Sequence, residues 1–236
     1  FFHLGKAYQD QEKFEYAIKF LILSLKINPN LEDAINSLAV CLIEIGKYDE
    51  AEKILMEGIK KNKKNKYFYS NLGKIYNETE QFNKSIMFYN LGLDIDINDP
   101  IINFGKAICL LKMGNINASI KFLNYRTNGY LLSNQFKSRF KSPRLTNLKN
   151  IKNKKILVIF EQGLGDTIQF CRYIKILLKE GAIVFFIPQK KLSFLMKTLD
   201  KNIKLFQEDD KIPNYDYFLP LFDLPFLFYK KYGSFN

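Results

Sequence analysis

Hydrophobic positions in the first half of the chain recur at a constant step of 34 residues. The step links bulky apolar residues in two registers, Leu4, Leu38 and Leu72, and Tyr8, Leu42, Tyr76 and Leu110. The same step links the small residues Ala17, Ala51, Ser85 and Ser119. Coincident registers over four copies indicate a structural repeat.

Each copy of the repeat predicts two helices. In the second copy, apolar residues lie at helical spacing over 35–42, Gly46 interrupts the pattern, and helical spacing resumes over 51–58. One such pair of helices cannot bury its apolar face alone, so we expect successive pairs to stack into a solenoid. Small residues at fixed positions let the helices approach closely.

The repeat resembles the tetratricopeptide repeat, and Pro29 near the end of the first copy belongs to this resemblance. The resemblance covers residues 1–125 and implies a concave face that binds a protein or peptide. The residues expected on that face are Lys6, Gln9, Asp10, Asn36, Val40, Glu44, Ser70, Lys74, Asn77 and Glu78. A spacer or dimerisation surface with a solvated polar face is the alternative interpretation. Because Phe1 would fall inside a helix, we expect the first copy to be truncated.

The second half of the chain changes to short apolar runs that alternate with helical segments. The runs predict strands over 154–161, 182–188, 203–206 and 217–221, and the segments between them predict helices over 167–179 and 190–199. Strands that alternate with helices indicate a parallel α/β sheet. The fold class is therefore a helical solenoid followed by a partial Rossmann-like parallel sheet over 154–236.

The loop after the first predicted strand carries the candidate chemistry. Its residues are Gln162, Gly163, Leu164, Gly165, Asp166 and Thr167. The glycines let a ligand approach the backbone, and Asp166 places at the start of a helix a carboxylate that can accept a proton from a hydroxyl. A helix cap without chemistry is the competing interpretation of Asp166. The spacing matches neither GxGxxG nor a P-loop, so we expect no nicotinamide or other cofactor.

Residues 161–173 and 215–225 resemble segments of bacterial glycosyltransferases that are fused to tetratricopeptide repeats, are similar to heptosyltransferases and have the two-lobed GT-B fold. The resemblance implies that Asp166 is the general base and that Gln162 to Thr167 shape the acceptor-side loop. It implies sugar transfer from a nucleotide-sugar donor to a hydroxyl of a glycan acceptor, by inversion and without a metal. Since the chain ends at Asn236, before a second lobe, we expect an inactive fragment of a longer enzyme. A non-catalytic scaffold for protein–protein interaction is the alternative.

The charge of the chain adds a third hypothesis. Lys and Arg number 36 against 24 Asp and Glu, which gives a formal net charge of +12. Basic residues accumulate in 126–153, a predicted linker between a repeat domain (1–125) and a sheet domain (154–236). This linker suits either an anchor for phosphate or an anionic membrane surface, hence peripheral membrane contact, or a solvated connector. Nucleic-acid binding is not expected, because Phe136 and Phe140 are too few aromatic residues to stack bases.

The reactive residue types exclude several kinds of site. Cys41, Cys109 and Cys171 are far apart in the sequence and odd in number, which argues against a disulfide framework and a zinc site. His3 is the only histidine, so a histidine-based triad or metal site is not expected. No apolar run reaches the roughly 18 residues of a membrane span, and we expect a cytoplasmic protein.

Overall fold

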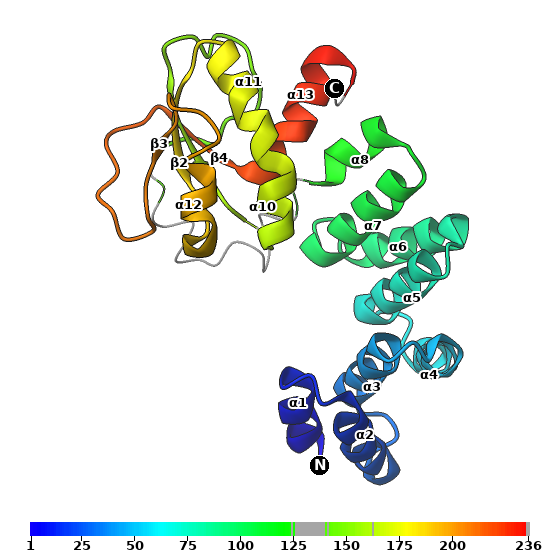
Figure 1. Cartoon of the computed structure of the whole chain (residues 1–236). Coiled ribbons are helices and arrows are strands. Elements are labelled where there is room, and N and C mark those ends of the chain that lie inside the picture. The colour runs from blue at the N-terminus through cyan, green and yellow to red at the C-terminus, as the bar shows by residue number, and fades with distance from the viewer. Residues whose placement is uncertain (124, 126–139, 141, 162, 235–236) are drawn as a thin grey trace. The chain divides into compact units, whose positions relative to one another are not determined.

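The computed structural model of the chain describes residues 1–123, 125, 140, 142–161 and 163–234. The chain divides into two compact units, Phe1–Tyr130 and Leu131–Asn236 (Figure 1). The first unit is helical and the second contains a small parallel sheet. Among the described residues, no helix is long and apolar enough to cross a membrane.

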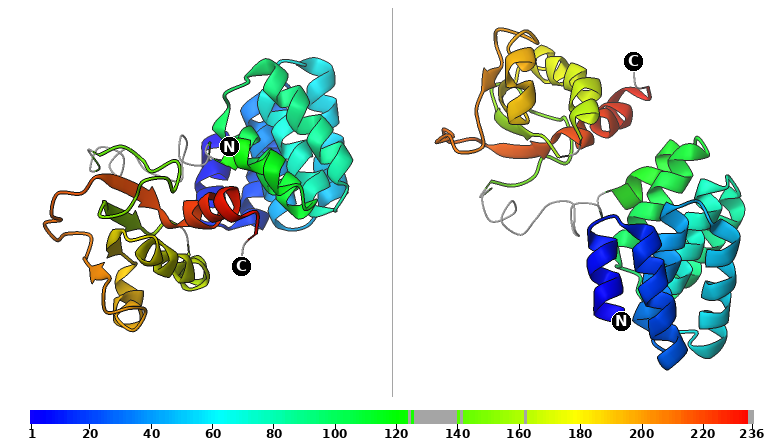
Figure 2. Two further views of the ribbon diagram at one scale, coloured as in Figure 1. Left: turned by 90° about the horizontal axis from the view of Figure 1, so that it is seen from above. Right: turned by 60° about the horizontal axis from the view of Figure 1, so that its bottom comes forward.

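The helices of the first unit are stacked side by side, as Figure 2 shows. In chain order they are α1 (Phe2–Asp10), α2 (Phe14–Ile27), α3 (Glu32–Glu44), α4 (Tyr48–Lys61), α5 (Lys66–Glu78), α6 (Phe82–Ile95), α7 (Pro100–Lys112) and α8 (Ile116–Leu123). The helices α2, α4, α6 and α8 begin 34 residues apart, which confirms the predicted solenoid of helix pairs.

Small residues bring neighbouring repeats into contact. A Cβ atom at Gly58 of α4 would lie 2.9 Å from the ring of Phe68 in α5. One repeat later, a Cβ atom at Gly92 of α6 would lie 2.8 Å from Ile102 in α7. Phe68 and Ile102 are completely buried, so the same glycine-to-bulky contact closes both of these junctions.

The turn between the two helices of a repeat contains one residue in the left-handed backbone region. These residues are Glu12, Gly46, Glu80 and Gly114, with φ of 59°, 76°, 58° and 76°. Glycine adopts this conformation without steric cost, whereas a side chain clashes with its own backbone. Two of the four turns therefore carry a strained glutamate.

We expect Gly46→Ala to lower and Glu80→Gly to raise the free energy of unfolding, the first by about 1 kcal/mol and the second by about 0.5 kcal/mol. No atom lies within 4 Å of a Cβ placed at Gly46, so its effect is one of backbone conformation alone. Urea unfolding of both variants measures these values. A change of the same sign in both variants would contradict the interpretation.

The sheet of the second unit has four parallel strands in the order β3-β2-β1-β4. The strands are β1 (Lys155–Ile159), β2 (Ile183–Ile187), β3 (Lys204–Leu205) and β4 (Tyr217–Pro220). All four lie within the predicted strands. Successive residues of a strand pack in two separate hydrophobic clusters, for example Val158 in one and Leu157 in the other. Both faces are covered, as parallel strands require.

The helices of the second unit differ from the prediction. The elements are α10 (Leu164–Phe170), η2 (Cys171–Tyr173), α11 (Ile174–Lys179), η3 (Lys190–Leu192), α12 (Ser193–Met196), η4 (Leu221–Asp223) and α13 (Leu224–Tyr232). The predicted helix over 167–179 begins three residues earlier, because Gly163 and not Asp166 is its N-cap, and a 3₁₀ turn interrupts it. The predicted helix over 190–199 is a 3₁₀ turn and one α-helical turn, and α13 was not predicted.

Part of the basic segment expected as a linker is built into the second unit. Leu145, Leu148 and Ile151 are buried in the same cluster as the strands. The N–H of Leu145 donates to the carbonyl of Phe218 in β4 at 2.9 Å. Arg144 forms a two-pronged ion pair with the buried Asp223, with hydrogen bonds of 2.8 and 2.7 Å. Residues 142–151 are therefore an edge of this unit and not a solvated connector.

Candidate functional site

The first helices of the repeats, α1, α3, α5 and α7, line a groove of about 790 Å³. Seven of the ten residues predicted for the concave face contribute to its lining, namely Lys6, Gln9, Asn36, Val40, Ser70, Lys74 and Asn77. The other three, Asp10, Glu44 and Glu78, do not line it. The helical periodicity of each first helix brings these residues to one side, and the 34-residue step superposes the sides of successive repeats. Whether they bind a ligand stays a prediction.

Hydrogen bonds hold the polar side chains of the groove in place. Lys74 of α5 pairs with Glu44 of α3 at 2.7 Å. Lys6 donates to Gln9 at 3.0 Å within α1. Lys6 also lies 3.8 Å from a carboxylate oxygen of Asp10. Each lysine thus has an acidic partner in the protein, and the groove does not require an acidic ligand to balance them.

Asn77 is the exception among these polar groups. The residue is 5% exposed and lines the groove. Its side-chain oxygen is buried and has no hydrogen-bond partner among the described residues. A buried acceptor without a partner costs about 1–3 kcal/mol, so this oxygen is a candidate acceptor for a donor of a bound ligand.

The sequence prediction missed the apolar end of the groove. Ile101, Phe104 and Ile108 of α7 line it beside Tyr67 of α5. Ile101 and Tyr67 are each 48% exposed. The 34-residue step could have found them, since it relates Ile101, Phe104 and Ile108 to Tyr67, Ser70 and Lys74. The lining is therefore mostly polar along α1, α3 and α5, where Phe2, Val40 and Tyr67 are the exceptions, and apolar on α7.

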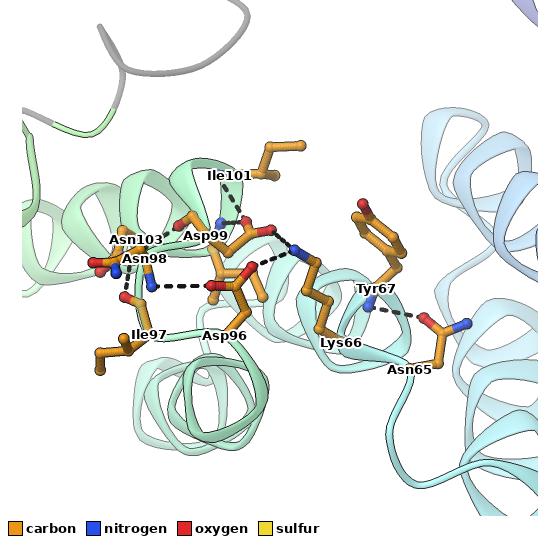
Figure 3. A network of polar contacts seen from close by, with 10 residues as sticks. Asn65, Lys66, Tyr67, Asp96, Ile97, Asn98, Asp99, Ile101 and Asn103 are labelled. Carbon is orange, nitrogen blue, oxygen red and sulfur yellow. Dashed lines mark hydrogen bonds and ion pairs between the residues drawn. The ribbon is translucent and has the colours of Figure 1, made fainter.

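An ion-pair network fixes α5 relative to the α6–α7 turn (Figure 3). The ammonium group of Lys66 lies 2.6 Å from a carboxylate oxygen of Asp96 and 2.6 Å from one of Asp99. The other oxygen of Asp99 caps α7 by accepting from the N–H groups of Ile101 and Ile102, both at 2.9 Å. The hydrogen bond from Lys66 lowers the pKa of the Asp96 carboxyl, and the two carboxylates raise the pKa of Lys66.

The preceding repeat carries the same network with donors and acceptors exchanged. Glu32 stands 34 residues before Lys66 and accepts from the side chains of Asn62 at 2.8 Å and Asn65 at 2.7 Å. In both repeats, the first residue of the first helix thus contacts two residues of the turn that leads into the first helix of the next repeat. The first residue of the first helix is therefore acidic in α3 and basic in α5, and its partners differ accordingly.

The loop after β1 contains the residues predicted for catalysis and substrate binding. Gly163, Leu164, Gly165, Asp166 and Thr167 form the N-terminus of α10, and Gln162 lies outside the described residues. Asp166 and Thr167 border a small hollow together with Glu161 and Phe222. Thr167 is 1% exposed, and its hydroxyl has no partner among the described residues.

The carboxylate of Asp166 has a structural partner. One of its oxygens accepts from the N–H of Gly163 at 3.0 Å, which is the reciprocal half of a capping box. The described residues contain no group of three His, Cys, Asp or Glu side chains that could hold a metal ion. The geometry favours the cap over a free base, while the role of Asp166 in catalysis stays a prediction.

We expect Asp166→Ala to lower the free energy of unfolding of the second unit by about 1 kcal/mol, because the N–H of Gly163 loses its acceptor. Thermal unfolding followed by circular dichroism measures the shift. Asp209→Ala is the matched control, since Asp209 is exposed. Equal melting temperatures of the two variants would show that the cap adds no stability.

Comparison with known proteins assigns most of the first unit. Models of the tetratricopeptide repeat match residues 8–75 and 67–98. Residues 8–98 are tetratricopeptide repeats. The matches end at residue 98, and nothing in the comparisons supports the glycosyltransferase resemblance of the second unit. The comparison with curated proteins gave no match.

Solved structures similar to the chain include several of the protein MamA. "Crystal structure of MamA" is 19% identical, covers 59% of this chain and 79% of that chain, and has a TM-score of 0.47. "MamA 41-end from Desulfovibrio magneticus RS-1" is 17% identical, covers 60% and 76%, and has a TM-score of 0.47. "MamA MSR-1 C2" is 20% identical, covers 58% and 75%, and has a TM-score of 0.43.

Proposed function

We propose that the tetratricopeptide repeats are a protein-interaction scaffold that binds an extended segment of a partner along the groove. The observation that carries the proposal is the change of the lining from mostly polar residues on α1, α3 and α5 to apolar residues on α7. An extended peptide offers backbone N–H and C=O groups to the polar part and one large apolar side chain to the shelf of Ile101, Phe104 and Ile108. A ligand that is polar throughout would leave this shelf in water.

Asn77 supports a peptide ligand in particular. Its buried side-chain oxygen lacks a donor among the described residues, and a peptide supplies N–H donors along its whole length. The ion pairs of Lys74 with Glu44 and of Lys66 with Asp96 and Asp99 hold neighbouring first helices in register without a ligand. The groove is therefore preorganised, which reduces the entropic cost of binding.

Peptides selected on the chain from a phage-displayed random library test the proposal. Selected peptides should carry a large apolar residue, and their affinity, measured by fluorescence polarisation, should fall at least about tenfold with Asn36→Arg, which fills the groove. Asn83→Arg is the matched control, because Asn83 is exposed on α6 and does not line the groove. Failure to select a peptide, or equal affinity of both variants, would contradict the proposal.

The same variants test the alternative of a dimerisation surface. Analytical ultracentrifugation would then show a dimer that Asn36→Arg dissociates and Asn83→Arg leaves intact, with no peptide selected. A monomer that binds peptides supports the peptide groove.

Sugar transfer by the second unit within a longer enzyme is a second candidate. One observation favours it, which is the position of Asp166 shortly after β1. From β1 the chain forms β2 and β3 on one side of this strand and then β4 on its other side. Ligands of parallel sheets bind at such a switch in strand order. Calorimetric titration with a nucleoside-diphosphate sugar tests whether this unit contributes to a donor or acceptor site. Asp166→Asn keeps an oxygen for the Gly163 cap but removes a base, so unchanged transfer by the longer enzyme with this substitution would refute the role.

A further inference from the structure

Nearly all the excess positive charge belongs to the second unit. Residues 131–236 contain 19 Lys and Arg against 9 Asp and Glu, a net charge of +10. Residues 1–130 contain 17 against 15, a net charge of +2. The charge is therefore a property of one unit and not of the whole chain, and this unit has an electrostatic preference for anions.

Part of this charge surrounds a hollow of about 840 Å³ in the second unit. The hollow is bordered by residues 147–152, by Glu180 after α11 and by the C-terminal half of α13. Its apolar lining comes from Leu148, Ile151 and Leu227, each at most 8% exposed. Its rim carries four lysines, Lys149, Lys152, Lys230 and Lys231.

Only one of these lysines has a counter-ion among the described residues. Lys231 lies 2.5 Å from Glu180, which also accepts a hydrogen bond from the hydroxyl of Tyr232. The hydrogen bond from Lys231 lowers the pKa of the Glu180 carboxyl, so this acid stays ionised at neutral pH and neutralises Lys231. Within the part of the chain that the structure describes, Lys149, Lys152 and Lys230 have no ion pair.

We propose that this hollow binds the phosphate group of a small phosphorylated molecule. Three lysines without a counter-ion supply the charge, and lysine binds phosphate as a point charge. The volume of the hollow is that of a small-molecule site, and its apolar lining accommodates the part of the ligand that carries no phosphate. A concave site of this size fits a small ligand better than a flat membrane surface.

The local backbone gives the hollow a defined shape. The side chain of Asn147 accepts from the N–H of Lys149 at 2.9 Å, and the N–H of Asn153 donates to the carbonyl of Gly181 at 2.7 Å. The first bond shapes the segment that carries Lys149, and the second holds the segment next to the residues that follow α11. The two lysines thus extend from a fixed loop, which favours binding at one place over diffuse attraction.

Calorimetric titration of the whole chain with inorganic pyrophosphate, at low and at physiological salt, tests the proposal. The site variant Lys149→Gln, Lys152→Gln and Lys230→Gln should weaken pyrophosphate binding at least about tenfold and flatten its salt dependence. The control variant Lys190→Gln, Lys191→Gln and Lys201→Gln removes the same charge from exposed lysines of the same unit and should change the affinity less than about twofold.

Three outcomes would overturn the proposal. Absence of pyrophosphate binding by the wild-type chain would contradict the proposed site. An equal loss of pyrophosphate affinity in the two variants would show that only the net charge matters. Phosphatidylcholine vesicles with and without phosphatidic acid provide the third arm. Vesicle binding that the site variant abolishes, without pyrophosphate binding by the wild type, would assign the lysines to a lipid surface. Peptide binding by the groove should be equal in both variants, so the two proposals fail independently.

Discussion

Gly73→Ala is expected to destabilise the first unit by about 2 kcal/mol or more, although alanine favours helices over glycine by about 1 kcal/mol. A Cβ atom at Gly73 of α5 would lie 2.5 Å from the ring of Tyr89. The ring has little room to move, because a Cβ placed at Gly105 of α7 would also lie only 2.8 Å from it. Tyr89 is 3% exposed and thus fills the space between two glycines of adjacent repeats.

A double-mutant cycle in urea unfolding measures this effect. Tyr89→Leu has a smaller side chain, so its combination with Gly73→Ala should cost less than the sum of the two single changes. Gly165→Ala is the control, since no atom lies within 4 Å of a Cβ there and the gain in helix propensity should remain. Additive costs, or stabilisation by Gly73→Ala, would show that the ring relaxes freely.

Lys66→Met should be the most damaging change in the ion-pair network. It leaves the carboxylates of Asp96 and Asp99 side by side without a cation, and the Asp99 side chain is only 5% exposed. Removing one partner of a fully buried pair costs about 3–5 kcal/mol, and we expect about 2 kcal/mol because Lys66 is itself 22% exposed. Glu32→Gln, at the equivalent position one repeat earlier, should cost less, because it leaves no unpaired charge.

The cost of Lys66→Met should depend on pH. Because Lys66 lowers the folded-state pKa of Asp96, this interaction stabilises the protein above the unfolded pKa, about 4, and is lost as the pH falls through the lower folded value. In the variant, acid protonates the adjacent carboxylates and relieves their repulsion. The difference in unfolding free energy between wild type and variant should therefore shrink as the pH is lowered from 7 past the unfolded value of about 4 and through the folded pKa of Asp96. A constant difference would contradict the role of charge.

The sequence predicts the first unit well because its structure repeats. A 34-residue step in Leu4, Leu38 and Leu72 places each pair of helices, and helical spacing then places Asn36 and Ser70 on the same concave side. Periodicity is a sum over many residues and survives local exceptions. The same step relates the apolar shelf of Ile101, Phe104 and Ile108 to Tyr67, Ser70 and Lys74, although the prediction did not include this shelf.

The 34-residue step does not predict interactions between single residues. The pairing of Lys66 with Asp96 and Asp99 depends on how the α6–α7 turn folds over the start of α5, and no pattern encodes it. The second unit lacks a repeat, so each element had to be predicted alone. The lysines around Leu145 and Leu148 predict a linker, whereas the structure buries the few apolar residues of this segment in the core of the sheet.

The position of Asp166 in the sequence does not decide its role. A carboxylate three residues after Gly163 has the same position in sequence whether it caps α10 or accepts a proton from a substrate. Only the 3.0 Å hydrogen bond from Gly163 separates the two interpretations, and it favours the cap. A loop motif therefore predicts where chemistry could occur and not that it does.

Amide hydrogen exchange of the chain, with and without a library-selected peptide, tests the central claim most directly. We expect the peptide to slow exchange most strongly in α5 and α7, which line both the polar and the apolar parts of the groove. The second helices of the repeats, α4 and α6, are called the outer helices, and they should change little, as should the second unit. Slowed exchange confined to the outer helices or to residues 142–234, with α5 and α7 unchanged, would contradict a peptide groove on the first helices of the repeats.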